Sequence, residues 1–175
     1  MNKTLLKTLS MVGALSVAAS IGAQDLSAVG AAKDWTVFQD PANAKHCYVV
    51  STPVGSKAFK DGAPVDASRG DIRLYIGIKN GATEPAFLAG YPLANDKAVE
   101  AKIGGQVFNF FTNPNANEQY AWPNPNNDSS LIAAMKNGTA IEVTALSKRG
   151  TQTVDQFSLS GFTAAYNKAA QTCGN

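Results

Sequence analysis

The sequence predicts an all-β protein, a β-sandwich with one short internal helix and a C-terminal helix. From Trp35 to Leu159 the apolar residues mostly recur with a period of two, which is typical of strands that bury one face. Turn-forming residues separate eight or nine such segments, as expected for a sandwich of short strands. Helical spacing replaces this alternation only near residues 127–137 and after Ser160.

The N-terminal segment is typical of a secretory signal peptide. Two lysines precede a short apolar run that ends in small residues at Ala23. We expect residues 1–23 to be removed before Gln24, which leaves residues 24–175 as a single β-sandwich domain. The run is shorter than the roughly 20 apolar residues that span a bilayer, and no later segment is apolar enough. The sequence therefore predicts a periplasmic or secreted protein without a transmembrane segment after cleavage.

The net charge gives no reason to expect a nucleic-acid partner. The chain carries 15 Lys and Arg and 13 Asp and Glu, a formal net charge of +2. Two of the lysines lie in the predicted signal peptide, so the mature chain carries 13 residues of each sign. We therefore expect neither nucleic acid nor an anionic membrane surface as a partner.

The predicted strands are separated by turns. The clearest runs from Ile72 to Ile78, where apolar and other residues alternate up to the turn signal Asn80-Gly81. The turn Gly104-Gly105 predicts a tight hairpin of the segments on either side of it, Val99 to Ile103 and Val107 to Phe111. Shorter candidate strands are Trp35 to Phe38, His46 to Ser51, Ala86 to Ala89, Gln119 to Trp122, Thr139 to Ser147 and Thr151 to Leu159. The segments Pro53 to Gly70 and Asn113 to Asn127 are predicted to be polar linking regions.

Two segments carry helical signals. Asn127 or Asp128 can cap a short helix that ends at Asn137-Gly138. After Ser160, apolar residues recur at helical spacing through Cys173, which therefore lies on the inward face of the predicted C-terminal helix.

The two cysteines, Cys47 and Cys173, are predicted to form a disulfide. An even pair in an exported protein favours a bridge because the compartment is oxidising. On its predicted strand Cys47 faces away from Tyr48, so both sulfurs can point toward one core. The alternative is a reactive thiol, but the chain has no Cys-x-x-Cys motif that would lower a thiol pKa.

No residue pattern indicates an active site or a metal site. His46 is the only histidine, and its neighbour Cys47 would point to the opposite face of the strand, so they form no catalytic dyad. One histidine and two bridged cysteines cannot build a zinc site. Asp61, Asp66 and Asp71 lack the alternate spacing of a calcium loop. We expect no catalytic residue, no metal and no cofactor, and a lysine-based site that no motif marks is left open.

The Asn- and Pro-rich segment contains the candidate binding residues Tyr120 and Trp122. Aromatic planes beside amide side chains suit a sugar or a partner protein. The alternative interpretation is that Trp122 closes one edge of the core and that the asparagines form turns.

The tripeptide Arg69-Gly70-Asp71 is one by which many extracellular proteins are held by cell-surface receptors. Such recognition needs both charges at the tip of a mobile loop, whereas Asp71 directly precedes the predicted strand that starts at Ile72. We therefore interpret the tripeptide as the entry of a polar loop into the sheet. Gly70 would supply flexibility there, and the two charged residues would be solvated or paired at the rim.

The last third of the chain carries a family resemblance. The segments that carry it are Ala133 to Gly138, Ser147 to Thr151, Asp155 to Ala165 and Cys173, together with Trp35, Cys47, Arg69 to Ile72 and Ala121 to Pro123. In these segments the chain resembles the invasion-associated locus B (IalB) family of exported bacterial proteins. The resemblance covers nearly all of the mature chain and is most specific from Ser147 to Ala165.

The resemblance implies an immunoglobulin-like β-sandwich with a C-terminal helix, in a protein of the periplasm or envelope. It brings no catalytic residues to this chain. We expect a non-enzymatic protein that binds or organises an unidentified protein or glycan of the cell envelope. The first alternative is a secreted adhesin that contacts a host surface or glycan through the aromatic loop. The second is an enzyme with an unrecognised polar site.

Overall fold

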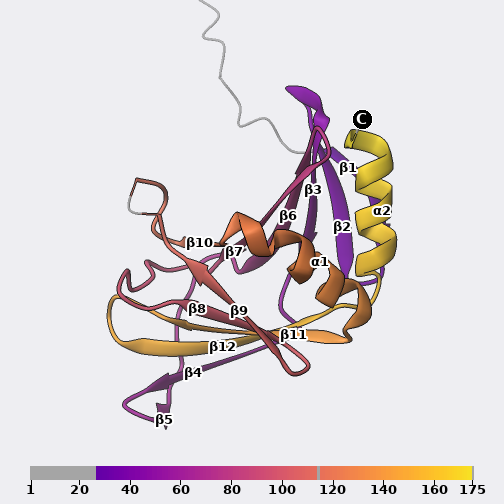
Figure 1. Ribbon diagram of the computed structural model, residues 1–175. Helices are drawn as coiled ribbons and strands as arrows, with labels where there is room; N and C mark the ends of the chain where they lie inside the picture. The colour runs from indigo at the N-terminus through magenta and orange to yellow at the C-terminus, as the bar shows by residue number, and fades with distance from the viewer. Residues whose placement is uncertain (1–26, 114, 175) are drawn as a thin grey trace, which may run out of the picture.

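The computed structural model describes residues 27–113 and 115–174, about half of which lie in antiparallel strands (Figure 1). The predicted signal peptide, residues 1–23, lies outside the described residues. In the part of the chain that is described, no helix has the length and apolar character needed to cross a membrane.

The elements follow the predicted order, with additional strands near the start. The strands are β1 Ser27–Ala32, β2 Trp35–Asp40, β3 Asn43–Ser51, β4 Gly55–Lys60, β5 Ala63–Pro64, β6 Arg73–Lys79, β7 Ala82–Leu88, β8 Val99–Ile103, β9 Gln106–Phe111, β10 Tyr120–Pro123, β11 Ala140–Leu146 and β12 Thr151–Ser158. The helices are the 3-10 turn η1 Pro125–Asn127, α1 Asp128–Asn137 and α2 Phe162–Cys173.

The strands form two layers that meet at β10. The order of hydrogen-bonded neighbours is β1-β2-β3-β6-β7-β10-β9-β8-β11-β12-β4-β5. Tyr120 and Ala121 of β10 pair with β7, whereas Trp122 and Pro123 pair with β9. We call the strands from β1 to β7 in this order the first sheet and those from β9 to β5 the second sheet. Figure 1 shows the two sheets as separate layers, with α2 lying along the first three strands.

The all-β prediction with one internal and one C-terminal helix is confirmed. The immunoglobulin-like arrangement is not confirmed, because β10 joins both layers into one run of paired strands. Alternation predicted the best-defined elements well: Leu74, Ile76 and Ile78 of β6 are buried, and β8 and β9 form the expected hairpin.

The interpretation of residues 53–70 as a linking region is wrong for β4. This strand pairs with β12 over six residues from Gly55 to Lys60. Its side chains are mostly exposed, so the backbone ladder, and not a buried face, holds it in place. A strand near the edge of a sheet therefore leaves little apolar alternation in the sequence.

The core lies between the two sheets and under α2. Phe87 of the first sheet packs edge-on against Phe157 of the second, with ring centroids 6.3 Å apart. Trp35 contacts Phe162 of α2 at 4.9 Å in a similar geometry, and its indole N–H donates to the Ser158 carbonyl at 2.9 Å. Buried aromatic rings dominate such cores because each removes a large apolar area from water.

A disulfide fastens the C-terminal helix to the first sheet. Cys47 of β3 and Cys173 at the end of α2 are bonded, with Cα atoms 5.8 Å apart and a sequence separation of 126. Both residues are buried. The predicted pairing is therefore present, on the predicted inward faces of the strand and the helix.

A buried ion pair joins the two sheets on another side. The Arg69 guanidinium donates to both carboxylate oxygens of Asp155 on β12, at 2.7 and 2.8 Å. It also donates to the carbonyl of Ala89, which follows β7, at 3.1 and 2.7 Å. Ser56 of β4 donates to the same carboxylate at 2.6 Å. The side chains of Arg69 and Asp155 are 7% and 0% exposed, so both charges depend on these partners.

We predict that Arg69→Met lowers the free energy of unfolding by about 3–5 kcal/mol, because it leaves the Asp155 carboxylate buried without its partner. The double variant Arg69→Met/Asp155→Leu removes both charges, so its free energy of unfolding should fall by less than that of the single variant. Arg73→Met is the matched control, since Arg73 pairs at 3.5 Å with Asp71, which is 76% exposed, and should cost about 0–1 kcal/mol. Urea unfolding measures all three, and equal losses in the first and third variants would contradict the prediction.

We predict that the disulfide contributes about 2–5 kcal/mol to stability, because it closes a long loop of the unfolded chain. The variant Cys47→Ser/Cys173→Ser should unfold at lower urea concentration by this margin. Intact mass should rise by two hydrogens when reductant is added to the unfolded protein. Two thiols that react in urea without reductant would show that the bridge does not form.

Candidate binding face and adjoining cleft

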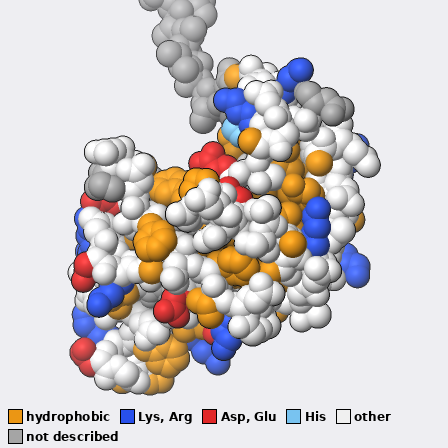
Figure 2. All heavy atoms as spheres, in the orientation of Figure 1, with side chains coloured by type: hydrophobic (Ala, Val, Ile, Leu, Met, Phe, Trp, Pro, Cys, Tyr) orange, Lys and Arg blue, Asp and Glu red, His pale blue; other side chains and the backbone are white. Residues whose placement is uncertain are grey.

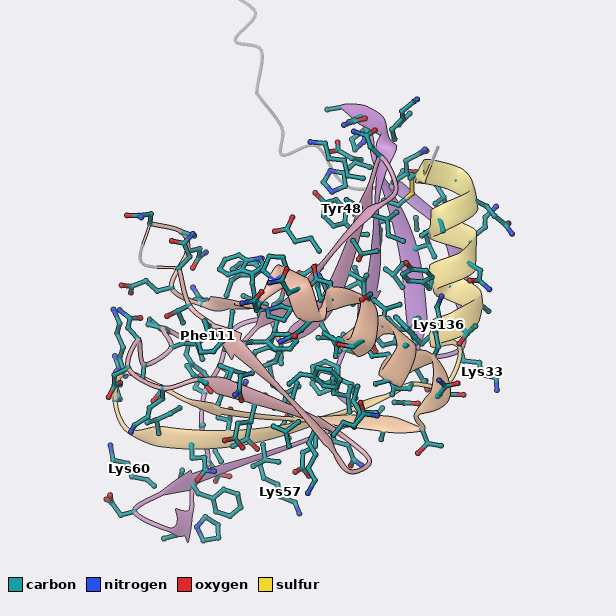
Figure 3. The ribbon with its side chains drawn as sticks, viewed as in Figure 1. Lys33, Tyr48, Lys57, Lys60, Phe111 and Lys136 are labelled. Carbon is teal, nitrogen blue, oxygen red and sulfur yellow. A yellow bond between two sulfur atoms is a disulfide. The ribbon has the colours of Figure 1, made fainter. Side chains whose placement is uncertain are left out.

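Strands β6, β9 and β10 carry partly exposed aromatic side chains on the face that points away from the core. Tyr75 of β6 and Tyr120 of β10 have ring centroids 6.1 Å apart. Tyr120 stacks on Trp122 at 5.7 Å with an angle of 21° between the planes. Phe111 of β9, 53% exposed, pairs directly with Trp122 in the ladder. We call Tyr75, Phe111, Tyr120 and Trp122 the aromatic face; Figure 3 labels Phe111 beside β10.

The alternation of β10 produces the outward position of the two predicted residues. Ala121 and Pro123 are buried, while Tyr120 and Trp122 are half-buried on the other side of the strand. Trp122 is therefore not one of the buried core residues, which argues against the alternative interpretation that it closes one edge of the core. The other part of that interpretation is confirmed, because the side chains of Asn113, Asn117 and Asn124 each accept a backbone N–H two residues on and so form turns. Tyr75 and Phe111 were not predicted as site residues. Alternation alone put Tyr75 on the outer face of its strand, but only the pairing of strands brings it next to Tyr120.

A cleft of about 600 Å³ lies beside Trp122, where the first sheet meets the start of α1. Its lining includes His46, Gly77, Glu84, Trp122 and Asp128. We call it the Gly77 cleft. Figure 2 shows hydrophobic side chains exposed on this side of the molecule, with acidic side chains close to the single histidine.

The position of Gly77 explains why the sheet is hollow here. In the ladder Tyr48 of β3 pairs with Gly77 of β6, which pairs with Glu84 of β7. Residues that are directly opposite in neighbouring strands project from the same face. The row therefore has a side chain on each flank and none in the middle.

The two carboxyl groups that line the cleft, those of Glu84 and Asp128, lack ion-pair partners among the described residues. Asp128 has a buried Oδ1 atom that accepts no hydrogen bond from any described residue. Burial raises the pKa of Asp128, and the nearby Glu84 charge raises it further. Within the described residues Glu84 forms no ion pair. In the part of the chain that the structure describes, the cleft thus carries two unpaired carboxyl groups beside Trp122, the exposed Glu84 and the half-buried Asp128.

His46 lies close to the floor of the cleft, with Nε2 3.8 Å from the point that a Cβ atom at Gly77 would occupy. Its Nδ1 atom lies 3.3 Å from the Tyr48 hydroxyl and 3.7 Å from an Asp40 carboxylate oxygen. Cys47, its neighbour, is buried on the opposite face of β3. Across the described residues, no three His, Cys, Asp or Glu side chains are grouped to hold a metal ion.

A second cleft, of about 640 Å³, lies over the buried ion pair of Arg69 and Asp155. The Tyr91 ring packs on the guanidinium at 4.9 Å, and its hydroxyl bonds with the Thr153 hydroxyl at 2.6 Å. At the rim Lys148 pairs with Glu118. These polar groups are already partners of one another, so this cleft is the weaker candidate for a ligand.

The Arg69-Gly70-Asp71 tripeptide does not display both charges. Asp71 is exposed, but Arg69 is committed to the ion pair and is buried, contrary to the expectation that it lies at the rim. Gly70 does not adopt the left-handed conformation either. Its N–H donates to the carbonyl of Gly90 at 2.9 Å, and it is Gly90 that has the positive φ of 75°.

Comparison with known proteins gives a family and a fold. A family model described as Invasion associated locus B (IalB) protein matches residues 35–170. The crystal structure of invasion associated protein B from Bartonella henselae is similar, with a TM-score of 0.56 and 14% sequence identity over 81% of this chain and 95% of that one. At this identity the likeness concerns the fold alone. No curated protein matches the chain.

We predict that Tyr75 stays neutral until about pH 12. Burial is the main cause of its raised pKa of about 12, and the adjacent Tyr120 adds to it. Because the folded pKa exceeds the usual value of 10, this contribution to stability is complete below pH 10 and is lost as the pH rises toward 12. Tyr75→Phe should remove the most alkaline step from a phenolate absorbance titration.

The variant Tyr120→Phe serves as the second arm of this titration. It removes the neighbouring hydroxyl but leaves Tyr75 buried, so the last step should move down while remaining above pH 10. A titration in which Tyr75→Phe leaves the alkaline limb unchanged would contradict the assignment.

Proposed function

Because this chain belongs to the invasion associated locus B family, we propose that it is an exported, non-enzymatic envelope protein that binds or organises a protein or glycan through its aromatic face. The observation that carries the proposal is the joining of four aromatic side chains, from three strands, on one outer face. Aromatic residues that are held half-exposed by a rigid sheet supply contact area at little entropic cost.

Two features support export to the periplasm or the exterior. The Cys47–Cys173 disulfide belongs to an oxidising compartment, because cytosolic thiols are kept reduced. The first 23 residues have the charge, the apolar run and the small-residue end of a signal peptide.

Two features support a binding role in preference to catalysis. His46 and Cys47 project from opposite faces of β3, which separates the histidine from the thiol chemistry of the chain. In the other cleft Arg69 pairs with Asp155, Tyr91 with Thr153 and Lys148 with Glu118, so these groups are already engaged with one another.

A secreted adhesin is the second candidate. The nearly parallel Tyr120 and Trp122 rings form a flat apolar surface of the kind on which a sugar ring can lie. A host glycan would use the same face as an envelope partner, so the two functions differ in where the contact occurs.

We predict that a photo-reactive residue at position 111 cross-links an envelope partner in intact cells. Phe111 is 53% exposed at the border of the aromatic face. The cross-link should be lost in Tyr120→Ala/Trp122→Ala, because this variant removes the stacked pair while its buried neighbours remain. Mass spectrometry of the product identifies the partner, and the melting temperature of the variant checks that it folds.

Position 54 is the matched control for this cross-link. Val54 is 62% exposed but lies beside β4, at the other end of the strand order. Equal capture from positions 54 and 111, or capture that survives loss of both aromatic residues, would refute the proposal. Capture only of a host-surface glycan or protein, and only outside the cell, would establish the adhesin instead.

A further inference from the structure

The lining of the Gly77 cleft indicates which kind of side chain the partner presents, on the premise that the aromatic face is the binding face. We infer that this cleft receives a lysine or arginine side chain of a partner protein, with Trp122 as the aromatic wall and Glu84 and Asp128 as counter-charges.

The floor of the cleft is a glycine that the backbone does not require. Gly77 lies inside β6 and is not among the residues with positive φ. A Cβ atom at this position would lie 3.7 Å from the Glu84 Cβ and 3.8 Å from His46 Nε2, which are ordinary contacts. Glycine weakens a strand interior and often marks the close approach of a ligand. Gly77 is itself buried, so the missing side chain leaves a narrow floor between Glu84 and His46.

The charge of the cleft is complementary to a cation. The buried Asp128 Oδ1 has no donor, and Glu84 has no ion-pair partner, among the described residues. Lys79 also lines the cleft but forms no ion pair with either described carboxylate. His46 is directed to Asp40 and Tyr48. A cation from outside would pair with the exposed Glu84 and offset its repulsion of Asp128, which together with burial, the larger cause, raises the Asp128 pKa.

The walls suit the rest of such a side chain. The electron-rich face of an indole attracts ammonium and guanidinium groups, and Trp122 lines the cleft on the side of the aromatic face. The buried Pro85 and Pro123 add apolar surface for the methylene stem of a lysine or arginine. A neutral sugar would use the aromatic wall and leave both carboxylates without counter-charge, so a basic segment of a protein is the better fit.

The test is a titration of the purified, disulfide-bonded protein followed by NMR. The probes are the Nα-acetyl methylamides of lysine and arginine, with that of norleucine as the uncharged analogue. We expect the two cationic probes to shift the Trp122 indole N–H and the Gly77 amide, and norleucine to shift neither. Glu84→Gln and Asp128→Asn should each weaken binding about tenfold, since each removes a charged hydrogen-bond acceptor.

Two further variants separate the cleft from the rest of the surface. Gly77→Val should abolish the shifts by filling the floor with a residue that favours strands. Glu118→Gln, at the rim of the other cleft, should leave them unchanged. If Gly77→Val fails to fold, as its amide spectrum would show, the two carboxylate variants still decide the outcome.

The inference is overturned if neither cationic probe shifts these resonances, if norleucine shifts them equally, or if N-acetylglucosamine binds the cleft more tightly than either cation. It is also overturned if Glu84→Gln binds the cationic probes as tightly as the wild type. These results leave the proposed function standing as long as the cross-link from position 111 still depends on Tyr120 and Trp122. Loss of that dependence, by contrast, removes the proposed function itself.

Discussion

The buried ion pair between Arg69 and Asp155 is the constraint on which the arrangement of the two sheets depends. A charge withdrawn from water is tolerated only when its hydrogen-bonding groups are satisfied, and Arg69 meets this condition by reaching two sheets at once. The residues that follow Arg69 lead directly into β6, and the carbonyl it binds, that of Ala89, lies just beyond β7. The pair thus fixes the end of β7 and the start of β6, the strand that carries both Tyr75 and Gly77.

The same alternation that builds the core also builds the binding face. Along β3, Cys47 and Val49 enter the core while Tyr48 points outward, and β10 repeats the pattern with Ala121 inside and Trp122 outside. Any force that keeps the inner set packed also holds the outer set in place. The disulfide and the packing of α2 on β3 therefore stabilise the outer face from the opposite side of the strands.

The sequence predicted what depends on local pattern and missed what depends on pairing. Alternation found β6, β8 and β9, and helical spacing placed Cys173 on the inner side of α2. The disulfide could be predicted from the sequence because the chain has only two cysteines. The ion pair could not be predicted, since Arg69 and Asp155 are 86 positions apart and each is an ordinary charged residue in its own segment. The sequence pattern did not reveal β4, because the backbone pairing of this strand needs no apolar alternation.

The Gly77 cleft explains why a chain without a recognisable motif can still carry a specific site. Its groups come from β3, β6, β7, β10 and the start of α1, and each one reads in the sequence as an unremarkable strand or helix-start residue. The antiparallel registers place Gly77 and Glu84 of the cleft in one row that runs across the strands and begins at Tyr48. A motif search runs along the chain and cannot detect such a row. The one local sign is a glycine inside an otherwise regular strand, and its meaning becomes visible only when its neighbours on both sides are known.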